Sequence, residues 1–143
     1  MSVILGAKDV IRERLRVRSV WVGTARTPLF PYLDAGGAVD EHMAGSAAVP
    51  TLVERYLRFV ISLLFQGNAI VHQSMKIEKL DENGVYHVKW PDLQIAPAAM
   101  PQIPEGSYDI ENPVIVLEGG TNLYGQVNGN SIAVTLTYWD NGR

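Results

Sequence analysis

The segment 112–139 limits what this chain can fold into more than any other part of it. It contains three apolar runs separated by two glycine turns, at 118–120 and 128–130. In the last run, apolar positions alternate with small or polar ones, which is the pattern of a strand with one buried face. These apolar positions are Ile132, Val134, Leu136 and Tyr138. The segment therefore predicts three consecutive strands, a terminal meander. None of its residues suggests a catalytic role.

Further strands are predicted earlier in the chain. Residues 14–22 alternate in polarity, and strand-like runs at 69–73 and 75–80 lead to another at 85–90. Asn83-Gly84 lies between the last two runs, and this dipeptide favours a hairpin because both residues tolerate positive φ. Residues 8–15 are compatible with a short helix. The sequence thus predicts a mainly β fold, an antiparallel sandwich or open barrel of about six to eight strands.

Residues 50–66 predict one packed α-helix. Pro50 suits the first helical position, Thr51 and Glu54 have the spacing of a capping box, and Gly67 is a natural stop. Apolar residues recur at spacings of three and four and form one broad stripe, namely Leu52, Val53, Tyr56, Leu57, Val60, Leu63 and Leu64. We expect this helix to pack on the sheet as part of the core.

The composition is that of one folded domain, 1–143. The chain has 143 residues, of which 47% are hydrophobic and 19% charged, and this excludes a disordered chain. The formal net charge of −3 gives no general reason to expect nucleic acid as partner. Residues 1–30 hold six basic and two acidic residues, whereas residues 31–143 hold six basic and thirteen acidic ones. This basic head and acidic body can attract each other, within one chain or between copies.

The predicted strand at 14–22 carries Arg14, Arg16 and Arg18 on one face. We expect this face to point at solvent or at an acidic partner. Two readings remain: an ordinary solvated strand face, or a contact with another subunit or with nucleic acid.

Two long segments, 24–48 and 91–112, have no sustained period and are rich in proline or glycine. Long loops of this kind are usually functional in compact domains. The first carries four apolar residues, Leu29, Phe30, Tyr32 and Leu33, which require a groove of the same chain or of a neighbour. We expect both segments to be extended loops or arms.

Few residues suggest a catalytic, metal-binding or cofactor-binding site. Cysteine is absent, which excludes disulfides and thiolate sites. His42, His72 and His87 lack partners at metal-ligand spacing, and no phosphate-binding loop, dinucleotide turn or nucleophile elbow occurs. Asp34, Asp40 and Glu41 lack the ligand alternation of a calcium loop. We therefore expect no enzyme, no catalytic or metal site and no cofactor, with His72 and His87 structural.

No membrane span or signal peptide is expected. The longest apolar segment, 49–65, carries Glu54, Arg55 and Arg58, whereas a span needs roughly 20 mostly uncharged residues. The start, Met-Ser-Val-Ile-Leu-Gly, is too short for the apolar part of a signal peptide and is followed by charges.

The stretch from Asn112 to Tyr138 resembles the closing segment of small tailed-phage virion proteins. The shared features are an apolar strand, an acidic-glycine turn, a Leu-aromatic strand, a Gly/Asn turn and an alternating strand. Residues 14–22 are also similar to the early strand of these proteins. The resemblance covers roughly a third of the chain and implies a β-sandwich or barrel-like structural subunit that works as a homo-oligomer on a particle.

The resulting hypothesis is a bacteriophage structural protein in the virion, most specifically a capsid decoration or cement subunit. Its partners would be further copies of itself, with a trimer favoured, and the major capsid or another virion protein. The expected interface residues are Arg14, Arg16, Arg18, Leu29, Phe30, Tyr32 and Leu33.

Three alternatives remain. One is a neck or tail component of the phage. Another is a carbohydrate-binding β-sandwich module, which would need solvent-facing aromatic residues on a sheet. The third is a small enzyme that uses His42 with Asp40 or Glu41.

Overall fold

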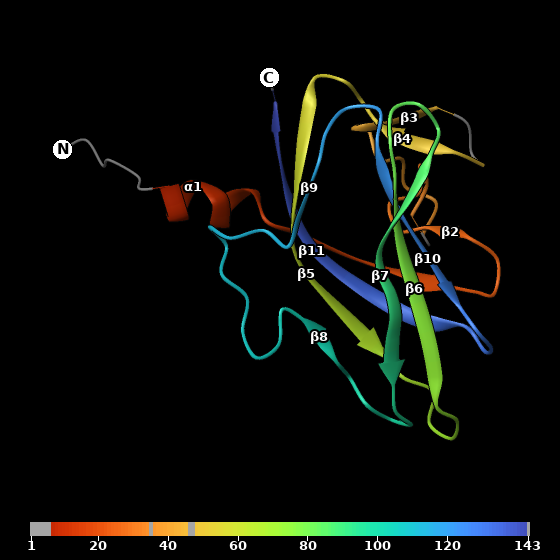
Figure 1. The fold of residues 1–143 in the computed structure, drawn as a ribbon. Coiled ribbons are helices and arrows are strands. Elements are labelled where there is room, and N and C mark those ends of the chain that lie inside the picture. The colour runs from red at the N-terminus through yellow and green to blue at the C-terminus, as the bar shows by residue number, and fades with distance from the viewer. Residues whose placement is uncertain (1–6, 35, 46–47, 143) are drawn as a thin grey trace.

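The structure is a computed structural model that describes residues 7–34, 36–45 and 48–142. The described residues form eleven strands and one helix (Figure 1). In chain order these are α1 (Ala7–Arg14), β1 (Arg16–Val22), β2 (Thr27–Pro28), β3 (Met43–Gly45), β4 (Pro50–Leu52), β5 (Tyr56–Gln66), β6 (Gln73–Leu80), β7 (Tyr86–Ile95), β8 (Gln102–Ile103), β9 (Ile115–Leu117), β10 (Asn122–Val127) and β11 (Ile132–Gly142).

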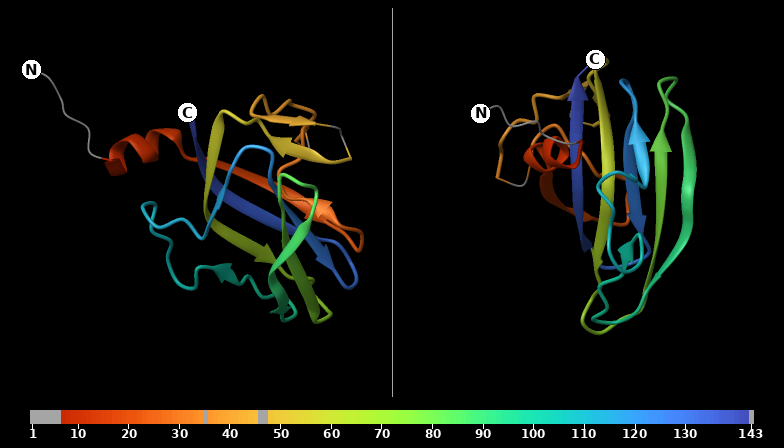
Figure 2. Two further views of the ribbon diagram at one scale, coloured as in Figure 1. Left: turned by 45° about the horizontal axis from the view of Figure 1, so that its top comes forward. Right: turned by 90° about the vertical axis from the view of Figure 1, so that its left-hand side faces the viewer.

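Nine of these strands form two antiparallel sheets. Sheet A has the order β1-β11-β5-β8, with β9 also paired to β5, and sheet B has the order β2-β10-β6-β7. In the right-hand view of Figure 2, β11 and β5 lie on one side and β6 and β7 on the other. The remaining strands, β3 and β4, pair with each other. The predicted fold class, a mainly β antiparallel sandwich with one α-helix, is confirmed.

The core lies between the two sheets. Val22 and Val134 of sheet A face Met75 and Leu123 of sheet B, and none of these side chains is more than 1% exposed. At Gly125 of β10 the sheets come so close that an added Cβ would lie 3.3 Å from atoms of three core side chains. Burial of apolar area at this density is the main contribution to folding.

The helix predicted at 50–66 is wrong. Residues 56–66 form β5, a central strand of sheet A, and the helix of this fold is α1 instead. The pairing of β5 with β11 shifts in register between Val60 and Ser62, which leaves Ile61 as the extra residue of a β-bulge. The bulge moves the inward-facing positions from 58 and 60 to 63 and 65, and the resulting spacing of three imitates a helical period.

The three terminal strands exist, but they do not form a meander. β9 and β11 belong to sheet A, whereas β10 lies in sheet B between β2 and β6. The two glycine turns therefore carry the chain from one sheet to the other and back. This alternation closes the sandwich, because β10 and β11 each occupy an inner position of their sheet.

The predicted hairpin after residue 80 is confirmed. β6 and β7 pair across it, and the backbone N–H groups of Asn83 and Val85 each donate to Asp81 Oδ1 at 2.9 Å. Gly84 takes φ of +80°, which a residue without Cβ adopts at little cost. β7 then continues through Pro91 to Ile95. Proline is tolerated here because β7 is the edge strand of sheet B.

The two predicted loops lie against their own chain. Leu29 and Phe30 of the segment 24–48 are fully buried in the core, whereas Tyr32 and Leu33 are 39% and 50% exposed. The segment 91–112 contains the end of β7 and also β8, which pairs with β5. Leu29 and Phe30 therefore fill a groove of the chain itself, not of a neighbour.

The described part of the chain contains no helix that is long and apolar enough to cross a membrane.

Candidate functional site

An open cleft of about 640 Å³ lies at one end of the sandwich. One wall is the inner face of sheet A, where β1, β5 and β11 contribute Arg18, Arg58 and Asp140. The other wall is the loop between β2 and β3, which contributes Asp40 and His42. Charged side chains thus gather at this end of the sandwich, where the apolar core gives way to solvent.

Arg58 is the centre of this cleft and is only 1% exposed. It lies in the inward register of β5, directly opposite Asp140 of β11. Arg58 Nε and Nη2 donate to the two oxygens of Asp140, both at 2.7 Å, and Nη1 donates to Asp40 Oδ2 at 3.2 Å. The guanidinium also lies over the rings of Phe30 and Tyr138, at 4.6 and 4.5 Å from their centroids. The two-pronged geometry is the strongest that an arginine and a carboxylate can form.

Two further side chains extend this network. Arg18 Nη1 donates to Asp40 Oδ2 at 3.1 Å, and its Nε has no hydrogen-bond partner among the described residues. His42 Nδ1 lies 2.6 Å from Asp140 Oδ2, and its ring stacks on Tyr56 with centroids 3.9 Å apart. Each carboxylate is therefore shared by Arg58 and by one more basic side chain.

The electrostatics follow from burial and charge. Burial by itself lowers the pKa of Arg58, but the hydrogen bonds and charge of Asp140, together with the charge of Asp40, outweigh it, and the pKa is raised. Burial also raises the pKa of Tyr138. The site therefore holds a permanent guanidinium between two carboxylates.

His42 is paired differently from the enzyme alternative. In the expected enzyme pairing, His42 would act with Asp40 or Glu41, but the structure brings it to Asp140 instead. Among the described residues, no group of three or more histidine and carboxylate side chains could hold a metal ion.

A second polar cluster lies on the outer face of sheet B. Arg26 Nε and Nη2 donate to the two oxygens of Glu78, at 3.1 and 3.3 Å, and the guanidinium lies 3.7 Å from the centroid of the Tyr86 ring. The hydrogen bond to Glu78 raises the pKa of Arg26. Tyr86 in turn packs edge-on against Tyr124, whose pKa is raised by burial. This cluster joins the loop before β2 to β6, β7 and β10.

Arg16 and Arg18 lie on the core-facing side of β1, at the border of the cleft, where Arg16 is exposed. Arg16 and Arg18 lie opposite Tyr138 and Leu136 of β11, whose side chains are buried. Arg18 does have an acidic partner, but it is Asp40 of the same chain. Arg14 ends α1, and its Nη1 donates to Asn141 Oδ1 at 3.4 Å.

The outward face of β1 is instead apolar. Val17 and Trp21 are each 67% exposed and flank Ser19, which is hydrogen bonded to Thr135 of β11. Further along the same face, Phe59 and Trp139 stack with their centroids 4.5 Å apart. Val17 and Trp21 are exposed on this face, whereas Phe59 and Trp139 are half-buried. The alternation of residues 14–22 is the sequence signal that places Val17 and Trp21 on the face opposite the arginines.

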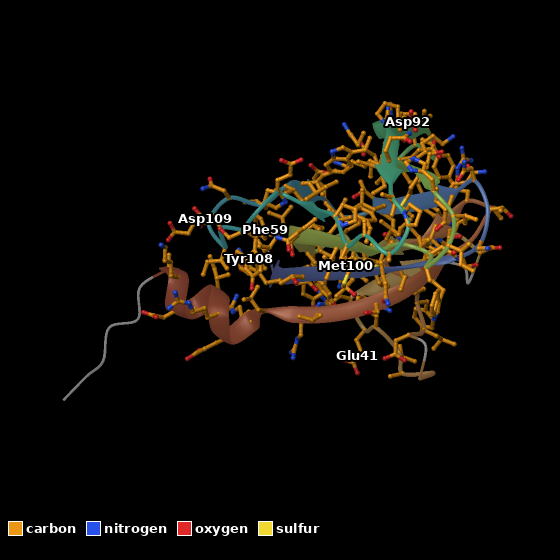
Figure 3. The ribbon with its side chains drawn as sticks, turned by 90° about the horizontal axis from the view of Figure 1, so that it is seen from below. Glu41, Phe59, Asp92, Met100, Tyr108 and Asp109 are labelled. Carbon is orange, nitrogen blue, oxygen red and sulfur yellow. The ribbon has the colours of Figure 1, made fainter. Side chains whose placement is uncertain are left out.

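Of the other two histidines, His87 lies 2.7 Å from Asp81 at the β6–β7 turn, and His72 lies 2.5 Å from Gln94. Both are exposed and make contacts between neighbouring chain segments, in keeping with a structural role. Glu41 lies on the loop beyond β1, on the side of the molecule away from Asp92 of β7 (Figure 3).

Comparison with known proteins identifies no family. No family model matches the sequence, and no curated protein matches it. A search of solved structures finds a chain in the crystal structure of the T13 IBDV viral particle, with a TM-score of 0.35 and 11% identity. The match covers 91% of this chain but 36% of that chain, so this chain spans about a third of its length. At this TM-score the likeness decides neither fold nor function.

Proposed function

We propose that the protein is a structural subunit of a virus particle that acts through surface contacts. The observation that carries this proposal is the exposed apolar face of sheet A, on which Val17 and Trp21 are each 67% exposed. Large exposed apolar side chains grouped on one face favour a protein contact over a solvated surface. The viral assignment comes from the resemblance of residues 112–138 to the closing segment of tailed-phage virion proteins.

The finer form of the proposal is a bacteriophage capsid decoration or cement subunit in the virion. Such a subunit stabilises a shell mechanically, because many weak contacts repeated over a lattice give a large total affinity. The sandwich offers Tyr32 and Leu33 at a loop and Trp21 on a sheet as contact points. Self-association, with a trimer favoured, belongs to this proposal, and a neck or tail component is its nearest alternative.

The test is the composition of purified particles of the virus that encodes the chain. Mass spectrometry should find the chain in many copies per particle, and its removal should lower the temperature at which the particles release their genome. A chain absent from pure particles would contradict the structural role. A chain present in only a few copies would contradict decoration and favour the neck or tail.

A catalytic role is not part of the proposal. Arg18 and Arg58 are paired with Asp40 and Asp140 in the cleft, and the ring of His42 is held between Asp140 and Tyr56. We expect His42→Ala to leave the particle contacts unchanged. A hydrolytic activity of the purified chain that His42→Ala removes would contradict this expectation.

A carbohydrate-binding module is the second candidate, because Trp21 is exposed on a sheet face that also holds the Phe59–Trp139 stack. Aromatic rings presented on a sheet can stack on sugars. Titration calorimetry with a panel of oligosaccharides tests this function. Binding that Trp21→Ala abolishes would favour the carbohydrate function over the structural one.

A further inference from the structure

The outer edge of β1 is open. β1 pairs on one side with β11, and none of the described residues makes a backbone hydrogen bond to its other side. The edge strands of sheet B are protected. β2 is two residues long and ends at Pro28, and β7 contains Pro91 and pairs with β6 through two register shifts. Proline, bulges and shortness are among the features that keep strand edges from pairing, and β1, with seven residues, has none of these three.

We propose that β1 pairs antiparallel with β1 of a second copy of this chain, about a two-fold axis at Ser19. The proposal replaces the trimer favoured under the proposed function by an assembly built from pairs of copies, and it rests on the proposed structural role for its biological use. An unpaired strand edge presents alternating backbone N–H and C=O groups. Another strand supplies the hydrogen-bond partners that these groups lack. The result is a continuous sheet across two copies.

The side chains of β1 select this register. A two-fold axis perpendicular to the sheet must pass midway between one residue and the same residue of the partner, because directly opposed residues point to the same face of the sheet. Centred on Ser19, the pairing places Val17 opposite the partner's Trp21 and Arg18 opposite the partner's Val20, and all seven residues pair. A pairing centred on residue 18 would place Arg18 opposite the partner's Arg18, and one centred on residue 17 would place Arg16 opposite the partner's Arg18. Both place like charges opposite each other, which is unfavourable. A pairing centred on residue 20 would leave residues 16 and 17 opposite the turn after β1.

The arginines do not prevent this pairing. An inward-pointing charge protects an edge when a partner strand would bury it. The side chain of Arg18 is already only 10% exposed and is paired with Asp40. Arg16, Val17 and Arg18 also border the cleft, so there is open space beside this part of the strand. The side chains that gain most from pairing are Val17 and Trp21, the two large apolar side chains exposed on the strand's outer face.

Single cysteines test the register directly, because the chain has no cysteine. Residues directly opposed across two strands have Cα atoms about 4.5–5.5 Å apart, which a disulfide can span. Ser19→Cys should therefore form a disulfide-linked dimer under mild oxidation, visible on non-reducing electrophoresis. Val17→Cys alone and Trp21→Cys alone should not, because identical residues would be separated by about 13 Å along the strand. A mixture of these two variants should cross-link as a heterodimer.

The solution mass of the unmodified chain completes the test. Light scattering should give an even number of copies, and Trp21→Lys should weaken self-association about tenfold or more, because the Val17–Trp21 pair occurs twice per dimer. The matched control is Val88→Lys on the protected strand β7, where Val88 is 51% exposed. Its self-association should equal that of the unmodified chain.

A monomer or an isolated trimer, or cross-linking through residue 17 alone, would overturn the inference. None of these results touches the structural role, which is read from the composition of purified particles. The failure of the pairing and the failure of the proposed function are therefore distinguishable.

Discussion

At the scale of a single residue, Arg58 shows how this fold stabilises a buried charge. Its side chain lies in the middle of a strand whose neighbouring inward positions are apolar, and it is held by two carboxylates and two aromatic rings. A buried charge is tolerable only when its partners satisfy it, and even then its net contribution to stability is small. The network therefore fixes how the loop holding Asp40 and His42 lies against sheet A.

Replacing Arg58 should be far more costly than replacing a neighbouring surface arginine. Arg58→Met leaves the carboxylates of Asp40 and Asp140 close together without the charge that separates them, and the free energy of unfolding should fall by about 3–5 kcal/mol. Arg55→Met is the matched control: Arg55 is exposed and its guanidinium lies 5.2 Å from the centroid of the Tyr56 ring, so its effect should stay within about 0.5 kcal/mol. Urea denaturation measures both. Equal effects of the two variants would refute the structural role of the network.

The Asp81 turn predicts a dependence of stability on pH. The hydrogen bond from His87 and those from the backbone N–H groups of Val85 and Asn83 lower the pKa of Asp81 below its ordinary value of 3.8. The charged carboxylate thus stabilises the folded state above pH 3.8, and this contribution is lost as the pH falls through the lowered pKa.

Asp81→Asn should therefore have a lower urea midpoint than the unmodified chain at pH 5, and the difference should shrink as the pH approaches 2. Glu82→Gln, an exposed neighbour in the same turn, is the control and should show no such dependence. A difference that grew on acidification would have the wrong sign and would rule out this account.

At the scale of elements, the sequence predicted most strands and misplaced one helix. Alternation of polarity and an Asn-Gly turn are local signals, and β1, the β6–β7 hairpin and β11 follow from them. β5 could not be recognised, because its bulge at Ile61 breaks the two-residue period and both faces are covered. The cleft could not be predicted either, since the Arg58–Asp140 pair joins residues 82 positions apart whose pairing depends on that strand.

The two glycine turns between the terminal strands differ in how tightly they pack. A Cβ at Gly119 would lie 2.3 Å from Glu54 Cα, which is backbone and cannot move aside, whereas a Cβ at Gly129 would meet nothing within 4 Å. Gly119→Ala should lower the free energy of unfolding by about 1–3 kcal/mol, and Gly129→Ala should change it by less than about 0.5 kcal/mol. Urea denaturation of the pair measures the difference. Equal stabilities would show that the turn at 118–120 does not pack on residue 54.

At the scale of the whole molecule, the chain crosses between its two sheets several times, and this topology determines which loops are free. The segment between β1 and β3 begins in sheet A, contributes β2 to sheet B and returns to the cleft with Asp40. Leu29 and Phe30 are buried on this path, whereas residues 32–34 and 36–39 are exposed. The predicted arm is thus an exposed loop that is anchored at its base by two buried side chains.

The two halves of this loop should respond differently to mutation. Phe30 is fully buried, with its ring 5.0 Å from that of Tyr138, so Phe30→Ala should lower the free energy of unfolding by about 3–5 kcal/mol. The double variant Tyr32→Ala and Leu33→Ala removes only exposed side chains and should change it by less than about 0.5 kcal/mol for each substitution. If the tip contacts a neighbouring subunit, the double variant should still fold normally yet show fewer copies per particle, counted by quantitative mass spectrometry. Unchanged copy number with unchanged stability would confine the segment to its own chain, and the contacts of the particle would then have to come from sheet A.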